Sequence, residues 1–432
     1  MSAYLVEKLK NKSAIISVVG VGYIGLPLLL NIGKAGFKVN GIDIDENKIS
    51  KLKNKKSYIS DISNEDLEYQ LGNINSVNFY SNYECVKESD VIIVCVPTPL
   101  NKTKDPDISY IIHAAEEISK FSSKNKLISI ESTVYPGATE ELILPIFLNK
   151  NPKQIIGQDF FMVFSPERID PGQSNWDLKN TPKVIGGITN DCTSIAKLLY
   201  QEICDSIIEV SSSKSAEMVK LLENTFRATN IGLVNEMAII CNKLGINIWE
   251  VIDAAKSKPY GFMPFYPGPG LGGHCIPIDP RYLEWKLETL NSESLYIKLA
   301  EKINFNMPQY VFSRINQIIT DNKLNKKVFL MGVSYKPNVS DIRESPAIEL
   351  MQIFIDNKYE VKFNDPYVPE ILLEGQNLYS TNFNQADNFF GVITADHQKY
   401  DWNKILNYFN HIFDTRNALK NTKNDSTHIF TL

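Results

Sequence analysis

The chain has 432 residues, more than a single hydrophobic core usually supports, so two or three domains are expected. Its residues are 43% hydrophobic and 22% charged, which is typical of a globular protein that folds. The net charge of -5 and the lack of a strongly cationic segment argue against nucleic acid as the main partner.

The amino-terminal sequence MSAYLVEKLKNKS has no apolar core of signal-peptide length, and no stretch of about 18 apolar residues follows. We therefore expect a cytoplasmic protein that does not cross a membrane. The six cysteines form no CxxC pair, and the five histidines form no HxxxH or HExxH spacing. Neither a disulfide framework nor a metal site is expected.

The first half of the chain alternates short apolar, β-rich runs with helical stretches. The runs are AIISVVG, KVNGID, DVIIVCVP, KLISIES, FFMVFSPE and KVIGG. Strands separated by helices predict a parallel sheet with crossover helices. We expect residues 1–205 to form a doubly wound, Rossmann-like domain.

A GxGxxG motif follows the first strand directly and opens a helix, a context in which glycines permit a tight turn and the helix amides meet a pyrophosphate. The next strand ends at Asp43, where a carboxylate would accept from ribose hydroxyls and repel a 2′-phosphate. NAD is therefore predicted as the cofactor rather than NADP. The alternative for the glycine motif is a plain strand-turn-helix corner in which the glycines only allow close packing. Lys48 either covers the adenosine phosphates or is an ordinary solvated lysine. Thr98 and Thr133 end later strands, where ligands of such sheets collect. The predicted cofactor residues are Gly20, Gly22, Tyr23, Ile24, Gly25, Asp43, Lys48, Pro97, Thr98 and Thr133.

The middle of the chain, residues 206–317, is predicted to be mainly helical. Residues 214–244 indicate one long helix ending at a glycine, and NIWEVIDAAKS a second. Lys220, Asn224 and Arg227 are spaced to lie on one face of the long helix; the alternative is a solvated polar face.

The segment PYGFMPFYPGPGLGGHCIPIDP is too rich in proline and glycine for regular structure and too apolar for a disordered linker. A long ordered loop of this kind is usually functional. Within it, two glycines precede Cys275 and let the backbone approach a ligand closely, and Asp279 follows four residues later. A buried structural cysteine is the alternative.

A second strand-helix rhythm begins at KKVFLMGVSYKP and continues through EVKFNDP, GVITAD and HIFDTRN. Residues 318–432 are therefore predicted to form a second, smaller Rossmann-like domain, joined to the first by the long central helix.

These motifs together resemble the UDP-glucose/GDP-mannose dehydrogenase family from about Ile15 to Asn417. The resemblance rests on GVGYIGLP, VCVPTP, ESTVYPG, FSPERIDPG, KLLENTFRATN, GPGLGGHCIPIDP and GVSYKPNVSDIRESP. ENTFRA with GGHCIPIDP is most similar to the branch that acts on UDP-N-acetylhexosamines, above all on UDP-N-acetylglucosamine (UDP-GlcNAc). The resemblance implies an NAD-binding domain, a central helix that builds a homodimer, and a C-terminal UDP-sugar-binding domain.

The implied reaction is a four-electron oxidation of the sugar C6 hydroxyl to a carboxylate, for surface polysaccharide precursors. UDP-GlcNAc is the expected substrate; the N-acetylgalactosamine, N-acetylmannosamine and glucose analogues (UDP-GalNAc, UDP-ManNAc and UDP-glucose) are alternatives. Covalent capture by a cysteine would hold the aldehyde on the enzyme while the cofactor is exchanged.

The resemblance also implies roles for individual residues. Cys275 would be the nucleophile, Lys220 and Asn224 would stabilise oxyanion charge, and Asp279 and Glu167 would manage protons with water. Thr133 would orient that water or the nicotinamide. The substrate-binding residues implied are Glu167, Arg168, Ile169, Lys220, Asn224, Arg227, Phe265, Tyr266, Gly270, Gly272, His274, Lys336 and Arg343.

The chain departs from many UDP-glucose enzymes at Tyr266-Pro-Gly-Pro-Gly, where those enzymes carry a lysine. Arg227 would either compensate for that charge or serve the N-acetyl group. Two other classes remain open: a two-electron β-hydroxyacid dehydrogenase, which would need neither Cys275 nor a second α/β domain, and a catalytically silent NAD- or UDP-sugar-binding protein.

Overall fold

The computed structural model describes residues 2–59, 62–101, 105–121, 124–169, 176–422 and 427–432. The chain divides into two compact units: unit 1 is Met1–Glu223 with Arg281–Ser292, and unit 2 is Asn224–Pro280 with Glu293–Leu432. Two helices, α8 (Ser213–Leu244) and α10 (Asp279–Thr289), each contain a boundary between the units. Among the described residues, no helix is both long and apolar enough to cross a bilayer.

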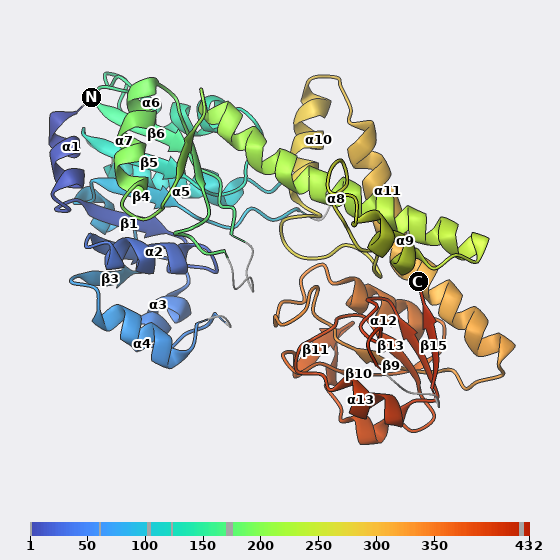
Figure 1. Ribbon diagram of the computed structural model, residues 1–432. Coiled ribbons are helices and arrows are strands. Elements are labelled where there is room, and N and C mark those ends of the chain that lie inside the picture. Colours follow the sequence, from blue (N-terminus) through green and yellow to red (C-terminus); the bar gives the residue numbers. More distant parts are fainter. Residues whose placement is uncertain (1, 60–61, 102–104, 122–123, 170–175, 423–426) are drawn as a thin grey trace. The chain divides into compact units, whose positions relative to one another are not determined.

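Unit 1 is built on an eight-stranded sheet in the order β3-β2-β1-β4-β5-β6-β7-β8 (Figure 1, blue to green). The strands are β1 (Ile15–Val19), β2 (Lys38–Ile42), β3 (Val77–Tyr80), β4 (Val91–Val94), β5 (Lys126–Ile130), β6 (Phe160–Phe164), β7 (Lys183–Gly187) and β8 (Ile207–Glu209). Its helices are α1 (Ala3–Lys10), α2 (Gly25–Lys34), α3 (Glu46–Lys53), α4 (Asn64–Gly72), η1 (Glu84–Lys87), α5 (Ser109–Phe121), η2 (Thr139–Ile143), α6 (Leu144–Lys150) and α7 (Asn190–Tyr200).

The central strands of this sheet are almost wholly buried, because helices such as α2 and α7 pack their apolar sides against them. In β1, for example, Ile16 and Val18 are fully buried and join one core cluster with Leu26 of α2 and Ile195 of α7. The strands pair in parallel, so their carboxyl ends meet at one edge, with Val19 of β1 opposite Val94 of β4. That edge carries the predicted cofactor residues.

Unit 2 contains the rest of α8, further helices and a five-stranded parallel sheet in the order β10-β9-β13-β14-β15 (Figure 1, orange to red). The strands are β9 (Lys327–Met331), β10 (Glu360–Asn364), β13 (Phe390–Ile393), β14 (His411–Asp414) and β15 (His428–Thr431), with a separate hairpin of β11 (Glu370–Leu373) and β12 (Gln376–Tyr379). The helices are α9 (Ile248–Ala255), α11 (Leu295–Asp321), α12 (Pro346–Asp356), η3 (Phe383–Gln385), α13 (Trp402–Ile405) and η4 (Leu406–Tyr408).

The prediction of two Rossmann-like parts with a long helix between them is confirmed. The expectation of a wholly parallel first sheet is wrong at one pair, since β7 runs antiparallel to β6. The sequence pattern also missed β3, β8, β15 and the β11–β12 hairpin. These strands are largely exposed or half-buried, so they show no continuous apolar run.

Candidate active site

The turn after β1 has the backbone geometry of a dinucleotide-binding loop. Gly20 has a φ of 86°, and a Cβ there would lie 2.5 Å from the carbonyl oxygen of Cys95. A Cβ on Gly25 would lie 1.8 Å from the Gly20 carbonyl oxygen, so α2 can start this close to β1 only with glycine. A Cβ on Gly22, in contrast, would meet nothing within 4 Å. Gly20 and Gly25 allow the backbone segments of this turn to pack closely, whereas Gly22 leaves open space of the kind that a pyrophosphate needs.

Asp43 follows β2 and borders this turn. Its Oδ2 accepts from the Val21 amide at 3.2 Å, and its Oδ1 accepts from the Asp45 amide at 3.0 Å. Lys48, on α3, forms an ion pair with Asp43 at 3.4 Å. The carboxylate is therefore fixed at the carboxyl end of β2, and Lys48 lies beside it rather than free in solvent. Tyr23 and Ile24 are exposed at the start of α2.

The ends of β4 and β5 are tied together next to that turn. Ser132 donates to the Val96 carbonyl at 2.8 Å, while Thr98 and Thr133 are both buried and Pro97 is exposed. Tyr282, on α10 within the same unit, donates to the Thr98 carbonyl at 3.1 Å. This tyrosine fixes the Thr98 loop, and no sequence motif singled it out.

Glu167 belongs to a buried group of charges behind this edge. Lys183, the first residue of β7, lies 2.6 Å from Glu131 Oε2 and 3.5 Å from Glu167 Oε2. Tyr200 donates to Glu131 at 2.5 Å. Burial alone would lower the pKa of Lys183, but the two carboxylates outweigh it and raise that pKa. Burial, together with nearby Glu167, raises the pKa of Glu131 despite the opposing charge of Lys183.

The Glu167 carboxylate is also tied to its own backbone. Its Oε1 accepts from the amides of Arg168 at 2.8 Å and Ile169 at 2.7 Å. Arg168 pairs with Glu223 at 2.6 Å and donates to the Pro182 carbonyl at 2.7 Å. The last residues of the FSPERIDPG motif, 170–172, lie outside the described residues. Glu167 is thus held as an acceptor, and the Arg168 guanidinium is engaged within the protein.

In unit 2, Asn224 and Asp279 are in direct contact. Asn224 Nδ2 donates to Asp279 Oδ2 at 2.6 Å, and Asp279 is 2% exposed. The Cys275 carbonyl accepts from the amides of Ile278 at 3.1 Å and Asp279 at 2.8 Å, which closes the turn that leads into α10. The half-buried Cys275 is therefore set one turn before the start of α10. Lys220, in unit 1, precedes Asn224 by one turn of α8 and is buried.

The two glycines before Cys275 have a packing reason that differs from the predicted one. A Cβ on Gly273 would lie 2.7 Å from the Tyr335 ring, and a Cβ on Gly272 would lie 2.6 Å from the Glu344 carbonyl oxygen. The Gly273 amide donates to the Arg343 carbonyl at 3.1 Å. The cysteine segment thus lies directly on the loop between β9 and α12, residues 332–345, which carries Lys336 and Arg343.

That loop brings charges near the cysteine segment. Arg343 is exposed and pairs with Asp341 at 2.6 Å. Burial opposes ionisation of Asp341, but Arg343, with a smaller effect from His274, keeps the pKa of Asp341 below its usual range. Lys336 and His274 are half-buried. Unit 2 therefore joins Asn224 to Asp279 and the Cys275 turn, and holds the backbone of the cysteine segment against the loop that carries Lys336 and Arg343.

The loop before the glycines is anchored by side chains that the sequence did not reveal. The rings of Phe265 and Tyr266 pack on Phe226 of α8 and Trp249 of α9, with centroids 5.7 and 6.1 Å apart. The Gly268 amide donates to Asn235 Oδ1 at 3.0 Å. A Cβ on Gly268 would lie 2.4 Å from the Arg416 guanidinium, and a Cβ on Gly270 2.8 Å from Pro346. The Arg416 guanidinium lies against this loop at Gly268.

Comparison with known proteins identifies the class. Three family models match in order: the NAD binding domain of the UDP-glucose/GDP-mannose dehydrogenase family at residues 14–204, its central domain at 214–306 and its UDP binding domain at 329–421. The chain belongs to this family. It is an NAD-dependent oxidoreductase of the UDP-sugar dehydrogenase class, which confirms the predicted enzyme class and cofactor.

Individual relatives are similar over most of their length. A UDP-N-acetyl-D-mannosamine dehydrogenase of Methanocaldococcus jannaschii is 36% identical over 94% of this chain and 92% of its own. A UDP-N-acetyl-D-glucosamine 6-dehydrogenase of Pseudomonas aeruginosa is 35% identical over 82% of this chain and 83% of its own. The solved structure of a UDP-D-ManNAc dehydrogenase from Pyrococcus horikoshii is 30% identical, with a TM-score of 0.86, over 96% of this chain and 98% of that one.

Proposed function

We propose that the protein oxidises the C6 hydroxyl of a UDP-N-acetylhexosamine to a carboxylate by a covalent mechanism at Cys275. The observation that carries the proposal is the seating of the Cys275 turn on the β9–α12 loop, through the Gly273–Arg343 hydrogen bond at 3.1 Å. This contact holds the segment that precedes Cys275 against the loop that carries Lys336 and Arg343 within the UDP binding domain, which supports the proposal.

The residues present suit NAD, because the Gly22 position is open and the Asp43 carboxylate is held at the end of β2, where a ribose acceptor would be needed. NAD would supply the hydride acceptor for both oxidation steps. The Cys275 sulfur would add to the C6 aldehyde as a thiohemiacetal, which becomes a thioester after the second oxidation and is released by water. Asp279, oriented by Asn224, would hold the alcohol proton, while Lys220 would stabilise the oxygen anion. Glu167, held as an acceptor, would take a proton from the hydrolytic water, and Thr133 would orient it.

For the nucleotide, we propose that Lys336 and Arg343 bind the UDP moiety. Arg416, which contacts Gly268, supports a positive environment at the loop where many relatives carry a lysine. Arg227, His274 and Arg168 are the proposed donors near the sugar C2 substituent; of these, Arg168 is already engaged by Glu223.

We propose UDP-GlcNAc as the preferred substrate. UDP-ManNAc, which differs only in configuration at C2, is the second candidate, since a relative 36% identical over 94% of the chain bears that activity in its name. UDP-GalNAc and UDP-glucose complete the set to be tested. A donor that pairs with the acetamido group should favour the N-acetyl sugars, because an unmatched buried polar group is costly.

The test is the purified protein with NAD and each of the four UDP-sugars, with NADH and remaining sugar both measured. Two NADH per sugar consumed, and the highest kcat/KM with UDP-GlcNAc, are expected. One NADH per sugar would replace the proposal with a two-electron dehydrogenase, and no NADH with any sugar would indicate a silent binding protein. If UDP-glucose is the best substrate, the N-acetyl assignment fails. Arg227→Ala should lower kcat/KM for the N-acetyl sugars more than for UDP-glucose.

We further propose that the enzyme is a cytoplasmic homodimer. Four apolar residues of α8 are exposed at spacings of seven, seven and four and so share one face of the helix: Phe226, Leu233, Ile240 and Leu244. Burying this face against a second copy would stabilise it. Analytical ultracentrifugation of the wild type and of Leu233→Glu tests the proposal, with a monomeric wild type contradicting it.

Three functional parts are proposed along the chain: NAD binding at 1–205, dimerisation and the cysteine loop at 206–317, and UDP-sugar binding at 318–432.

A further inference from the structure

The two α/β parts of the chain share one backbone arrangement at the end of their first strand. Gly20 after β1 and Gly332 after β9 have φ values of 86° and 85°. Asp43 after β2 accepts from the Val21 amide, and Asp365 after β10 accepts from the Val333 amide at 2.7 Å. Asp365 thus occupies the position at which a dinucleotide-binding domain presents its ribose acceptor.

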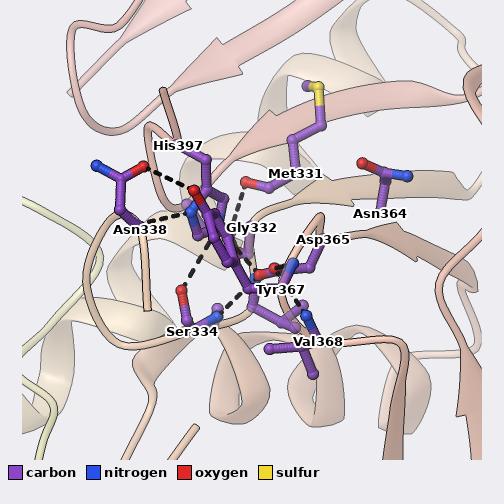
Figure 2. Close-up of polar contacts among 12 residues, drawn as sticks. Met331, Gly332, Ser334, Asn338, Asn364, Asp365, Tyr367, Val368 and His397 are labelled. Atoms are coloured by element: carbon purple, nitrogen blue, oxygen red, sulfur yellow. Dashed lines mark hydrogen bonds and ion pairs between the residues drawn. The ribbon is translucent and has the colours of Figure 1, made fainter. Parts of the chain in front are cut away.

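The environment of Asp365 excludes that role. Its carboxylate accepts hydrogen bonds from four backbone amides, those of Val333, Ser334, Tyr367 and Val368, and its side chain has no exposed surface. His397 Nε2 lies 3.0 Å from Asp365 Oδ2 and closes the remaining side (Figure 2). Burial opposes ionisation, but His397 and the amides lower the pKa of Asp365. The Asp365 carboxylate is therefore occupied by hydrogen bonds within the protein and is not available to a ribose hydroxyl.

The other nitrogen of His397 contacts the β9–α12 loop. The Asn338 amide donates to His397 Nδ1 at 2.9 Å, so Nδ1 carries no proton and Nε2–H is the donor toward Asp365. Asn338 has a φ of 63°, which asparagine tolerates, and its Oδ1 accepts from the Gln398 amide at 2.8 Å. Two hydrogen bonds thus hold the loop at Asn338 to residues 397 and 398, and Figure 2 shows the one to His397.

The pinned loop is the one that carries Lys336 and Arg343. Ser334 Oγ lies 3.4 Å from His397 Nε2 and donates to the Lys336 carbonyl at 2.8 Å. The Tyr335 amide donates to the Asp341 carbonyl at 3.0 Å, which closes the loop on itself. His397 therefore connects the buried Asp365 carboxylate to Ser334 and Asn338, on either side of Lys336.

We propose that His397 is a positioning residue for UDP binding: its Nδ1 holds the Asn338 amide, and with it the conformation of the loop from which Lys336 and Arg343 extend. The role rests on the proposed function of that loop. His397 makes no contact with the UDP moiety in this role. It lowers the free-energy cost of ordering the loop when the nucleotide binds.

Two substitutions separate the two hydrogen bonds of His397. His397→Gln can place an amide nitrogen near the Nε2 position and keep the bond to Asp365, but it loses the acceptor for Asn338. His397→Asn can place its oxygen near the Nδ1 position and keep that acceptor, but it loses the bond to Asp365. The matched control is His428→Gln, because His428 is exposed on β15 of the same unit.

The experiment measures the Kd of the full chain for UDP, and separately for NAD, by isothermal titration calorimetry. His397→Gln should weaken UDP binding roughly three- to tenfold, the range one hydrogen bond provides, with NAD binding unchanged. His397→Asn and His428→Gln should stay within about twofold of the wild type. In turnover, His397→Gln should raise KM for the UDP-sugar more than it lowers kcat.

Equal UDP affinity in His397→Gln and the wild type, or equal weakening in the Gln and Asn variants, would overturn the positioning role. If His397→Gln does not fold, His397→Leu replaces it, since leucine is close in shape to asparagine but offers no acceptor to the Asn338 amide. Equal UDP affinity in His397→Leu and His397→Asn would then overturn the proposal. A wild type that binds NAD but not UDP would instead refute the proposed function of the loop.

Discussion

Asn224 Nδ2 lies 2.6 Å from Asp279 Oδ2, so the side-chain amide of Asn224 on α8 orients the Asp279 carboxylate at the start of α10. If these two residues act as one unit, their effects on turnover should not multiply. Asn224→Ala and Asp279→Asn should each lower kcat roughly 10²- to 10³-fold. The double variant should be little slower than the slower single variant. Steady-state rates of all four proteins test this, and fully multiplicative losses would mean that the two side chains act separately.

Cys275→Ser should abolish sustained NADH production while leaving NAD and UDP binding largely intact, because a serine hydroxyl does not form a readily hydrolysed thioester. The control is Cys85→Ser. Burial raises the pKa of the Cys85 thiol to about 11, so this cysteine stays protonated and inert, and its variant should turn over normally. Near-normal steady-state rates in Cys275→Ser would refute the covalent mechanism.

Asp43→Ala should weaken NAD binding and reduce the preference for NAD over NADP. The substitution removes both a ribose acceptor and a negative charge that repels the 2′-phosphate of NADP. Asp45→Ala is the matched control. Asp45 caps α3 by accepting from the Asn47 amide at 2.9 Å, so its loss should cost about 1 kcal/mol of stability and leave cofactor choice unchanged. The measurement is kcat/KM for NAD and NADP; a wild type that uses both equally would contradict the role of Asp43.

Lys183→Met should destabilise the protein by roughly 3–5 kcal/mol, because it leaves Glu131 and Glu167 buried without their shared cation. Adding Glu131→Gln should recover part of the loss. Lys197→Met is the control: it breaks an ion pair of the same 2.6 Å length with Glu209, but on the surface, where about 1 kcal/mol or less is expected. Denaturant unfolding measures all three, and equal losses in the two lysine variants would contradict this account.

Glu217 links stability to pH. Burial raises its pKa to about 7 from the ordinary 4.5, although hydrogen bonds from Thr139 and Gly137 oppose the shift. Between these two values the folded state binds more protons than the unfolded state, so the free energy of unfolding should fall as pH rises, by up to roughly 3 kcal/mol, and should level off above pH 7. Glu217→Gln should flatten this part of the pH profile, whereas Glu250→Gln, on the exposed side of α9, should not. Identical slopes in all three proteins would show that Glu217 does not titrate in this range.

Most of the strands that the sequence predicted are buried along nearly their whole length; β10, with one buried residue, is the exception. β4 is four consecutive buried residues, Val91–Val94, and appears as an apolar run. β8, Ile207–Glu209, has no fully buried residue, and its pairing with β7 depends on the tertiary structure rather than on local pattern. The antiparallel pairing of β7 with β6 is likewise a tertiary feature that the local pattern of either strand does not encode.

Candidate site residues inside local motifs can be proposed from the sequence, whereas residues defined by distant contacts cannot. Cys275 and its glycines stand out as a pattern, but the ring of Tyr335, which explains Gly273, lies 62 residues further on. Lys183 looks like an ordinary first residue of a strand, and its buried partners are Glu131, 52 residues earlier, and Glu167, 16 residues earlier. His397 lies 59 residues from Asn338, whose backbone amide donates a hydrogen bond to it.

The shared arrangement of Gly20 with Asp43 and of Gly332 with Asp365 bears on how this chain arose. The second part has the same left-handed glycine and the same aspartate-to-amide hydrogen bond without a GxGxxG sequence, since Gly332 is followed by Val333-Ser334-Tyr335. Duplication of one ancestral α/β unit would leave this result: the hydrogen bonds needed for folding persist in both copies, and the residues needed only for a dinucleotide are lost from one. Kinship between the halves is therefore better sought in backbone geometry than in motif searches.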